Sequence, residues 1–405
     1  MEKKMNAAIS KCLIFCLLLV CLIRNFGETQ FFPNWFDEFL VISFFFYNIL
    51  VGKISFKKNN DSFFKNFFVL VVFSVLGAFI GLYHGISELS ILYDILDILK
   101  IPLFFILLSM INIEKSLFPW IKKTYVLLNI PSVIFGLFQW FMANFKGRYI
   151  GLSIYRDRAL GARINGFAGH NIALGFAMMV NIIFLLEVPQ KKWWHKLLII
   201  GSFCCLLFSQ SRIPIALTIL YLLYKYVYLK VRRIGRAIIV VLTFLCSVFV
   251  LWGAIFDSYS YSQSEEETVR YRTIIQGVNV FFDYPVAGYG LGAYGTSMSV
   301  KTMSPFYGDY PDRRATNIFA RGATREAFAF QILIETGLMG LFLYYYPFIS
   351  CAIRARKRKD FDLFYLVSFG FILQSFMNGI YQMPIFFILC FMEGRAKCLP
   401  PKSSL

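Results

Sequence analysis

Charged residues are scarce in this chain, and histidines are scarcer still. Asp, Glu, Lys and Arg make up 16% of the 405 residues and hydrophobic residues 58%, whereas an ordinary soluble domain is about 25% charged. This balance excludes a water-soluble globular protein and predicts a membrane protein with several spans. The three histidines, His84, His170 and His195, are scattered, so we expect neither a histidine metal site nor a Ser-His-Asp triad.

Motifs of nucleotide-dependent enzymes are also missing. The sequence has no Gly-x-x-x-x-Gly-Lys-Ser/Thr motif, and the glycines at 288, 290 and 292 do not open a strand–helix unit. The nine cysteines fall in expected spans or near their cytoplasmic ends, which excludes a disulfide framework. We therefore expect no metal and no cofactor. The net charge of +18 is spread over short clusters between apolar runs, a pattern that does not favour a nucleic-acid partner.

Apolar runs that could cross a bilayer occur about twelve times, since a span needs about 20 apolar residues. The sequence therefore predicts an all-α polytopic membrane protein. Residues 1–256 hold the spans before one large loop, residues 257–327 form this loop, and residues 328–405 hold the last spans and a tail. The expected spans are centred on 6–23, 37–52, 66–83, 91–110, 124–143, 167–187, 195–209, 213–229, 237–256, 328–350, 363–378 and 381–393. No cleavage site follows the first run, which we interpret as a retained span.

Basic residues set the expected orientation. When both termini are placed in the cytoplasm, most of the 41 Lys and Arg residues fall in cytoplasmic segments, as basic loops resist translocation. The large loop then faces outward. We also expect membrane lipids to surround the spans.

Several arginines depart from this expected distribution of basic residues, because they fall on the outer side of the membrane. They include Arg212, in a short outer turn before a span, and residues of two outer loops. A single arginine of this kind can pair with a carboxylate such as Asp157 or with lipid headgroups. A shared anion site explains the whole set better, since guanidinium groups match phosphate oxygens. The set is Arg158, Arg163, Arg212, Arg270 and Arg325.

An outward-facing, arginine-lined site suits a reaction in which a lipid-linked diphosphate leaves. Arginines can neutralise the charge that develops on the diphosphate. A carboxylate or an imidazole can take the proton from an attacking hydroxyl. Within the spans, Asp94, Asp97 and Lys100 share one helix face by their i, i+3 spacing. They predict either a helix-locking ion pair between Lys100 and Asp97 or a polar lining of the substrate cavity.

Four segments between residues 160 and 345 together resemble the O-antigen ligase/polymerase superfamily of bacterial envelope enzymes. The first is Gly166-Phe-Ala-Gly-His-Asn171, before a span. The second is Ser-Gln-Ser-Arg212, which opens another span. The third begins at Arg270 and continues through an amphipathic helix to Pro285 and the glycines at 288, 290 and 292. The fourth is Glu335-Thr-Gly337-Leu-Met-Gly340. The resemblance implies a GT-C-like fold in the bacterial inner membrane, with the large loop in the periplasm.

The resemblance implies an enzyme that moves a glycan from undecaprenyl diphosphate to a hydroxyl. Arg212 and Arg270 match the arginines that hold the diphosphate. The ligases of the family have a histidine where this chain has Glu326, so Glu326 is the candidate base. Candidate substrate-binding residues are Arg158, Arg163, Asn171, Arg272 and Arg325. Asn171 is alternatively a helix cap, Glu326 a helix N-terminal charge, and the glycines turn-formers.

The absence of the ligase histidine favours the polymerase branch, so we predict an O-antigen polymerase. The alternative within the family is a ligase that transfers the glycan to the lipid A core. An alternative of another class is a transporter of a lipid-linked anionic solute, although the sequence shows no internal repeat of the kind found in transporters. The lipid-linked glycan is the expected partner, and a chain-length regulator protein is a further candidate.

Overall fold

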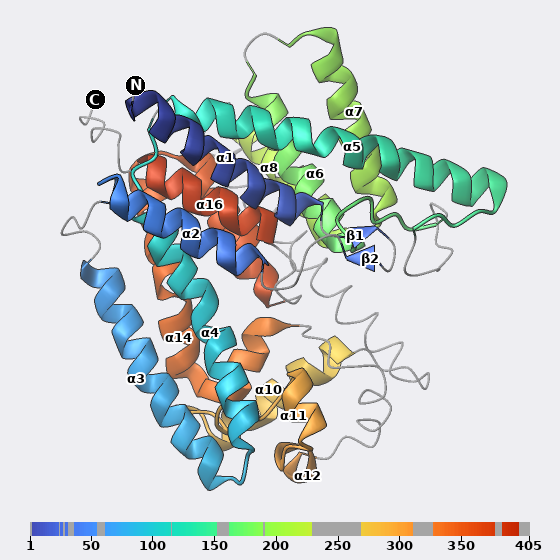
Figure 1. Cartoon of the computed structure of the whole chain (residues 1–405). Coiled ribbons are helices and arrows are strands. Elements are labelled where there is room, and N and C mark those ends of the chain that lie inside the picture. Colours follow the sequence, from blue (N-terminus) through green and yellow to red (C-terminus); the bar gives the residue numbers. More distant parts are fainter. Residues whose placement is uncertain are drawn as a thin grey trace. The chain divides into compact units, whose positions relative to one another are not determined.

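The computed structural model of the chain is almost entirely helical where it is described (Figure 1). The described residues are 2–23, 25–26, 29–30, 36–54, 61–114, 116–151, 162–188, 191–228, 269–310, 327–376 and 383–396. Within these ranges the named strands are β1 (Asn25–Phe26) and β2 (Thr29–Gln30), which pair antiparallel. The expected helical class is therefore confirmed.

The chain divides into two compact units, each built from segments distant in sequence. The first unit comprises Met1–Ser55, Ile111–Val250 and Tyr381–Leu405, and the second comprises Phe56–Met110 and Leu251–Ile380. Every expected apolar run among the described residues coincides with a helix, and the run at 237–256 lies outside them.

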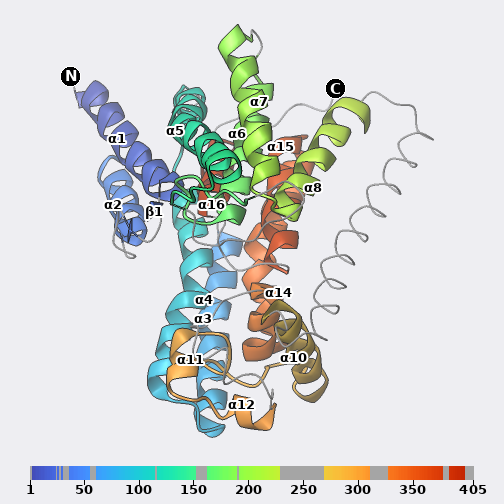
Figure 2. The ribbon, with the colours of Figure 1, turned by 90° about the vertical axis from the view of Figure 1, so that its right-hand side faces the viewer.

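The first unit is organised around one buried helix. Its helices are α1 (Glu2–Leu22), α2 (Phe36–Leu50), α5 (Leu117–Lys146), α6 (Asn171–Leu186), α7 (Trp193–Phe208), α8 (Arg212–Leu222), the π-helix η2 (Leu223–Tyr228) and α16 (Met383–Ala396). Helix α6 contacts α5, α7, α8 and α16, and Figure 2 shows it beside α7 and α8. It is apolar on all faces and buried from Ala173 to Leu185, as expected of a helix in the centre of a bundle.

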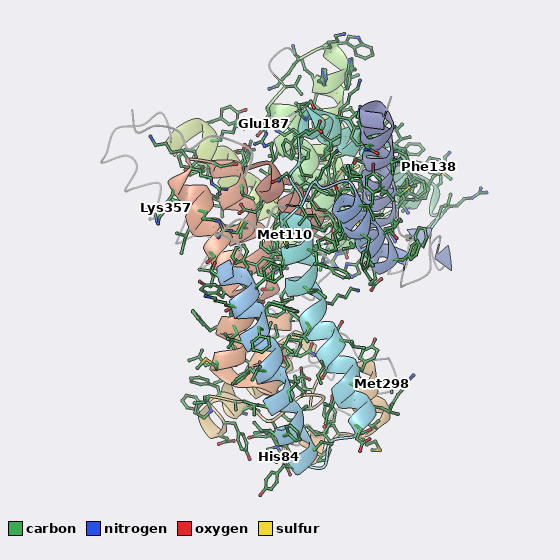
Figure 3. The ribbon with its side chains drawn as sticks, turned by 60° about the vertical axis from the view of Figure 1, so that its left-hand side comes forward. His84, Met110, Phe138, Glu187, Met298 and Lys357 are labelled. Atoms are coloured by element: carbon green, nitrogen blue, oxygen red, sulfur yellow. The ribbon has the colours of Figure 1, made fainter. Side chains whose placement is uncertain are left out.

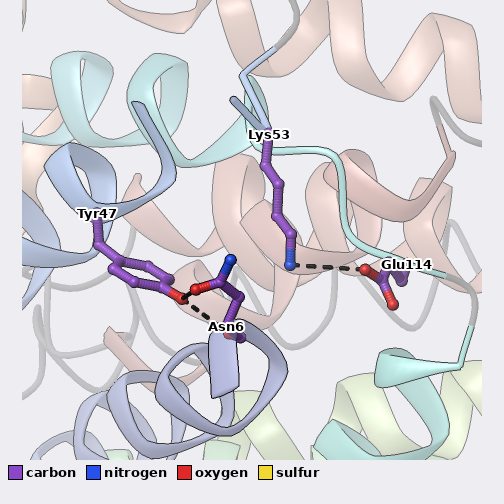
Figure 4. A network of polar contacts seen from close by, with 4 residues as sticks. All are labelled: Asn6, Tyr47, Lys53 and Glu114. Carbon is purple, nitrogen blue, oxygen red and sulfur yellow. Dashed lines mark hydrogen bonds and ion pairs between the residues drawn. The ribbon is translucent and has the colours of Figure 1, made fainter. Parts of the chain in front are cut away.

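An ion pair at one end of the first unit shows how α5 and α6 run relative to one another. Lys122 near the start of α5 pairs with Glu187, the residue after α6. The two helices are therefore antiparallel, and the start of α6 lies at the opposite end, with the last residues of α5. A second network joins the Tyr47 hydroxyl to the backbone oxygen of Asn6 at 2.8 Å, near the Lys53–Glu114 pair (Figure 4).

The second unit consists of long helices with a compact loop region at one end. Its helices are α3 (Asp61–Tyr83), α4 (Glu88–Ser109), α10 (Val269–Asp283), α11 (Ser297–Lys301), α12 (Phe306–Asp309), α14 (Phe328–Lys357), α15 (Phe361–Tyr365) and the π-helix η3 (Leu366–Leu373). Figure 3 shows His84 at the turn between α3 and α4, at the end opposite to Met110. Helix α14 is interrupted at Gly337, whose φ of 61° and ψ of −166° are not helical.

Three of the described helices are long and apolar enough to cross a membrane, namely Ser62–Tyr83, Leu117–Lys146 and Phe328–Lys357. Helix α4 has a similar length but carries Asp94, Asp97 and Lys100 in its middle. Asp94 is fully buried, and Asp97 and Lys100 are half-buried. The three therefore lie on an inward face, as their spacing predicts.

Candidate functional site

A tight turn between α7 and α8 places Arg212 at the first position of α8. The turn begins at Ser209, whose hydroxyl accepts a hydrogen bond from the Ser211 amide at 3.3 Å. Between them, Gln210 has a φ of 51°, a left-handed conformation that is unusual for a residue with a side chain. Arg212 is exposed, so its guanidinium group is accessible.

The start of α6 is tied to this turn by Asn171. Its side-chain amide donates to the Ser209 carbonyl oxygen and to the Ser211 hydroxyl, both at 3.2 Å. Close approach of the two elements requires Gly175, because a Cβ there would lie 2.9 Å from the Pro214 side chain. The N-termini of α6 and α8 therefore meet at one place.

Gln139 holds the segment that carries Arg163 against α5. Its amide nitrogen donates to the Asn165 side-chain oxygen at 3.0 Å, and its oxygen accepts from the Gly166 amide at 2.9 Å. The Ile164 amide donates to the Phe208 carbonyl oxygen at 3.3 Å, which joins this segment to the end of α7. Arg163 thus lies on the same side of the unit as the start of α6.

His170 is the N-cap of α6 and lies within electrostatic range of Arg163. Its ring nitrogen Nδ1 accepts a hydrogen bond from the Ile172 amide at 3.2 Å.

These elements form a positively charged centre in the first unit, which we call the arginine centre: Arg163, His170, Asn171 and Arg212. Each helix N-terminus carries a partial positive charge and favours an anion. Two such termini and two arginines concentrate positive charge in one part of the unit. The arrangement therefore suits phosphate oxygens.

The second unit contains a glycine loop that fills the break in α14. The amides of Tyr289 and Gly290 donate to the carbonyl oxygens of Ile334 and Glu335 at 2.7 and 3.2 Å. At Gly290, a Cβ would lie 2.5 Å from the Gly81 backbone nitrogen, and its φ is +115°. Glycine at this position allows close backbone packing and a left-handed turn. This agrees with the expectation that the glycines form turns.

A buried polar cluster connects this loop to α10. The Glu335 carboxylate is fully buried and accepts a hydrogen bond from the Tyr294 amide at 3.2 Å. The Tyr294 hydroxyl lies 3.0 Å from the Thr273 hydroxyl on α10. Thr273 and Arg270 belong to the same helix, α10. Burial raises the pKa of the nearby Tyr307, and the charges of Glu335 and Asp94 contribute to this rise.

The structure brings three of the predicted site residues together and places two more on one helix. Arg163, Asn171 and Arg212 belong to the arginine centre. Arg270 and Arg272 lie in the first turn of α10. The remaining predicted residues, Arg158, Arg325 and Glu326, lie outside the described residues.

His170 was not among the predicted site residues, and the helix-cap alternative for Asn171 is wrong. The cap of α6 is His170, whereas Asn171 is the first helical residue and bonds the turn before α8. The sequence feature that indicates the cap is the position of His170 directly before an apolar helical run.

Part of the chain is similar to a known protein family. Residues 197–345 match a family model described as O-antigen ligase. This range runs from α7 to α14 and includes Arg212 and Arg270. No curated protein matches the chain. The similarity to this family rests on residues 197–345, which are less than half of the chain.

Proposed function

We propose that the protein is an O-antigen polymerase of the bacterial inner membrane, with both termini in the cytoplasm and residues 257–327 in the periplasm. It joins repeat units that are linked to undecaprenyl diphosphate. The observation that carries the proposal is the arginine centre, where the N-termini of α6 and α8 meet, with Arg212 at the start of α8 and Arg163 in the segment before α6. About twelve spans complete the proposed topology.

In the proposed reaction, a hydroxyl oxygen of one glycan attacks the anomeric carbon of the other. The bond between this carbon and the diphosphate oxygen breaks, and the electron pair leaves with undecaprenyl diphosphate. Arg212 and Arg270 stabilise the charge on the leaving diphosphate. Arg158, Arg163, Asn171, Arg272 and Arg325 contact the substrates. Glu326 takes the hydroxyl proton.

A ligase that transfers the glycan to the lipid A core is the second candidate, because the matched family model bears that description. The two functions differ in what remains on the lipid A core when the gene is deleted. Loss of a polymerase leaves a single repeat unit on the core, whereas loss of a ligase leaves none.

The test is complementation of the deletion strain with single variants. Arg212→Ala and Arg270→Ala should leave the protein in the membrane at wild-type amounts and reduce long-chain polysaccharide to single repeats. Arg148→Ala is the matched control, since Arg148 is an exposed arginine just after α5. Normal chain-length ladders in both variants would reject the proposal.

A further inference from the structure

Aromatic rings from three segments of the chain meet at the end of the second unit that holds the turn between α3 and α4. In this turn, the ring of His84 lies 4.3 Å from the ring of Tyr289 and 5.6 Å from that of Tyr284 (Figure 3). The ring of Tyr289 lies 6.0 Å from that of Tyr310, which follows α12. The buried Phe306 packs against both of these tyrosines, at 5.2 and 5.0 Å. The fold therefore assembles one aromatic group from segments that are distant in sequence.

Tyrosine hydroxyls hold two carboxylates at this group. The Tyr310 hydroxyl donates to Oδ2 of Asp283 at 2.5 Å, and the Tyr289 hydroxyl donates to Oδ2 of Asp309. The pairing is crossed, because Asp309 directly precedes Tyr310, whereas Asp283 is the last residue of α10. Each bond occupies one carboxylate oxygen. Within the part of the chain that the structure describes, Oδ1 of neither aspartate makes a hydrogen bond.

The carboxylates and one of the rings are open to solvent. Asp283, Tyr284 and Asp309 are exposed, with 38% of the surface of Tyr284 accessible, and Tyr310 is half-buried. The Gln276 side-chain amide donates to the Tyr310 carbonyl oxygen at 3.2 Å, which ties this tyrosine to α10. The acceptor oxygens and the ring are thus presented on a rigid support.

We propose that Asp283, Tyr284, Asp309 and Tyr310 bind the glycan, and we call them the tyrosine–aspartate surface. The inference rests on the proposed function and deepens it by giving the saccharide a binding surface. A sugar ring has an apolar face of C–H groups, which packs on the face of an aromatic ring. Its hydroxyls donate hydrogen bonds to carboxylate oxygens. The surface offers both kinds of contact.

The charge of the surface decides which part of the substrate it fits. Two carboxylates repel a diphosphate, and no ion pair joins Asp283 or Asp309 to a basic residue among those described. A hydroxyl-rich saccharide has no such penalty and supplies the donors that the carboxylates lack. In the proposed topology, the turn at His84 and residues 257–327 both lie in the periplasm, where the glycan is joined.

Two kinds of substitution separate binding from a purely structural role. In Asp283→Asn and Asp309→Asn, the remaining oxygen still accepts from the tyrosine, while the outer acceptor becomes an amide donor. Tyr310→Phe removes the bond to Asp283 and keeps the carboxylate. A purely structural role predicts greater damage in Tyr310→Phe, and the proposed role predicts greater loss of binding in the double Asn variant. Glu88→Gln is the matched control, since Glu88 is an exposed carboxylate at the start of α4.

The full chain in detergent would be titrated with the saccharide that mild acid releases from the lipopolysaccharide of the host strain, which carries no diphosphate. We expect the double Asn variant to unfold at the wild-type temperature and to bind this saccharide about 10-fold more weakly, since it loses hydrogen bonds to charged groups. Tyr284→Ala should also bind more weakly, whereas Tyr284→Phe keeps the ring and the affinity. Wild-type affinity in the double variant, an equal loss in Glu88→Gln, or no binding by the wild-type chain would overturn the proposal.

Two further arms complete the test. Addition of EDTA should leave binding unchanged, and loss of binding on chelation would assign the carboxylates to a metal ion instead. Arg212→Ala should bind the free saccharide as the wild type does and lose glycosyl transfer. Lost transfer in Arg212→Ala with wild-type binding in the double Asn variant rejects the surface and leaves the proposed function standing. Normal transfer in Arg212→Ala rejects the proposed function, whatever the saccharide affinity of the double variant.

Discussion

The two units of the molecule handle polar groups in opposite ways. In the first unit, the arginine centre is built from cations and helix N-termini, and Arg212 is exposed. In the second unit, the polar cluster is built from a carboxylate and hydroxyls, and Glu335 and Thr273 are buried. An accessible positive centre can receive an anion, whereas a sealed cluster whose groups bond one another supports the fold. We infer that the cluster holds α10, and with it Arg270, in place.

The glycine loop offers the strongest way to disrupt the second unit alone. Gly290→Ala would force a side chain into a left-handed conformation and against the backbone of Gly81, 2.5 Å away. We expect a loss of more than about 3 kcal/mol in the free energy of unfolding. The measurement is thermal unfolding in detergent.

Gly308→Ala is the matched control for this substitution. A Cβ at Gly308 meets no heavy atom within 4 Å, so its stability should stay near that of the wild type. Equal stability of the two alanine variants would show that the loop is not packed as described.

The buried carboxylate can be altered with less damage. Glu335→Ala leaves the Tyr294 amide without its acceptor, at a cost of about 1–3 kcal/mol for a buried donor. Glu335→Gln keeps an acceptor oxygen and should lie between the alanine variant and the wild type. Denaturant unfolding of the three proteins tests this order, and a Gln variant less stable than the Ala variant would contradict it.

The smallest expected effect concerns the link between the cluster and α10. Tyr294→Phe removes the hydroxyl that lies 3.0 Å from the Thr273 hydroxyl. This should lower the free energy of unfolding by about 1 kcal/mol. Thr273→Val should cost a similar amount, and the double variant should cost less than the sum of the two. Additive losses in this double-mutant cycle would show that the two hydroxyls do not interact.

The sequence predicts the helices well and the contacts between them only partly. Long apolar runs specify helices locally, so the runs at 66–83 and 91–110 coincide with α3 and α4. The interruption at Gly337 was not predicted, because it depends on the backbone of a loop some fifty residues earlier in the chain.

The sequence predicted which residues belong to the candidate site but not how they are arranged in space. Arg163 and Arg212 were chosen because basic residues on the outer side oppose the charge rule. That Asn171 joins α6 to the turn before α8 depends on Gly175 and Pro214 meeting, which is a tertiary contact. His170 was not predicted as the cap of α6, because the hydrogen bond from the Ile172 amide to its ring nitrogen is not visible in the sequence.

The most direct test of the account is glycosyl transfer by the purified chain with lipid-linked repeat units as both donor and acceptor. Each new glycosidic bond should release one molecule of undecaprenyl diphosphate, and Arg212→Ala should slow this release by about 100-fold or more while Arg148→Ala leaves it unchanged. Equal rates in the two arginine variants, or binding of the lipid-linked donor with no new glycosidic bond, would contradict the account.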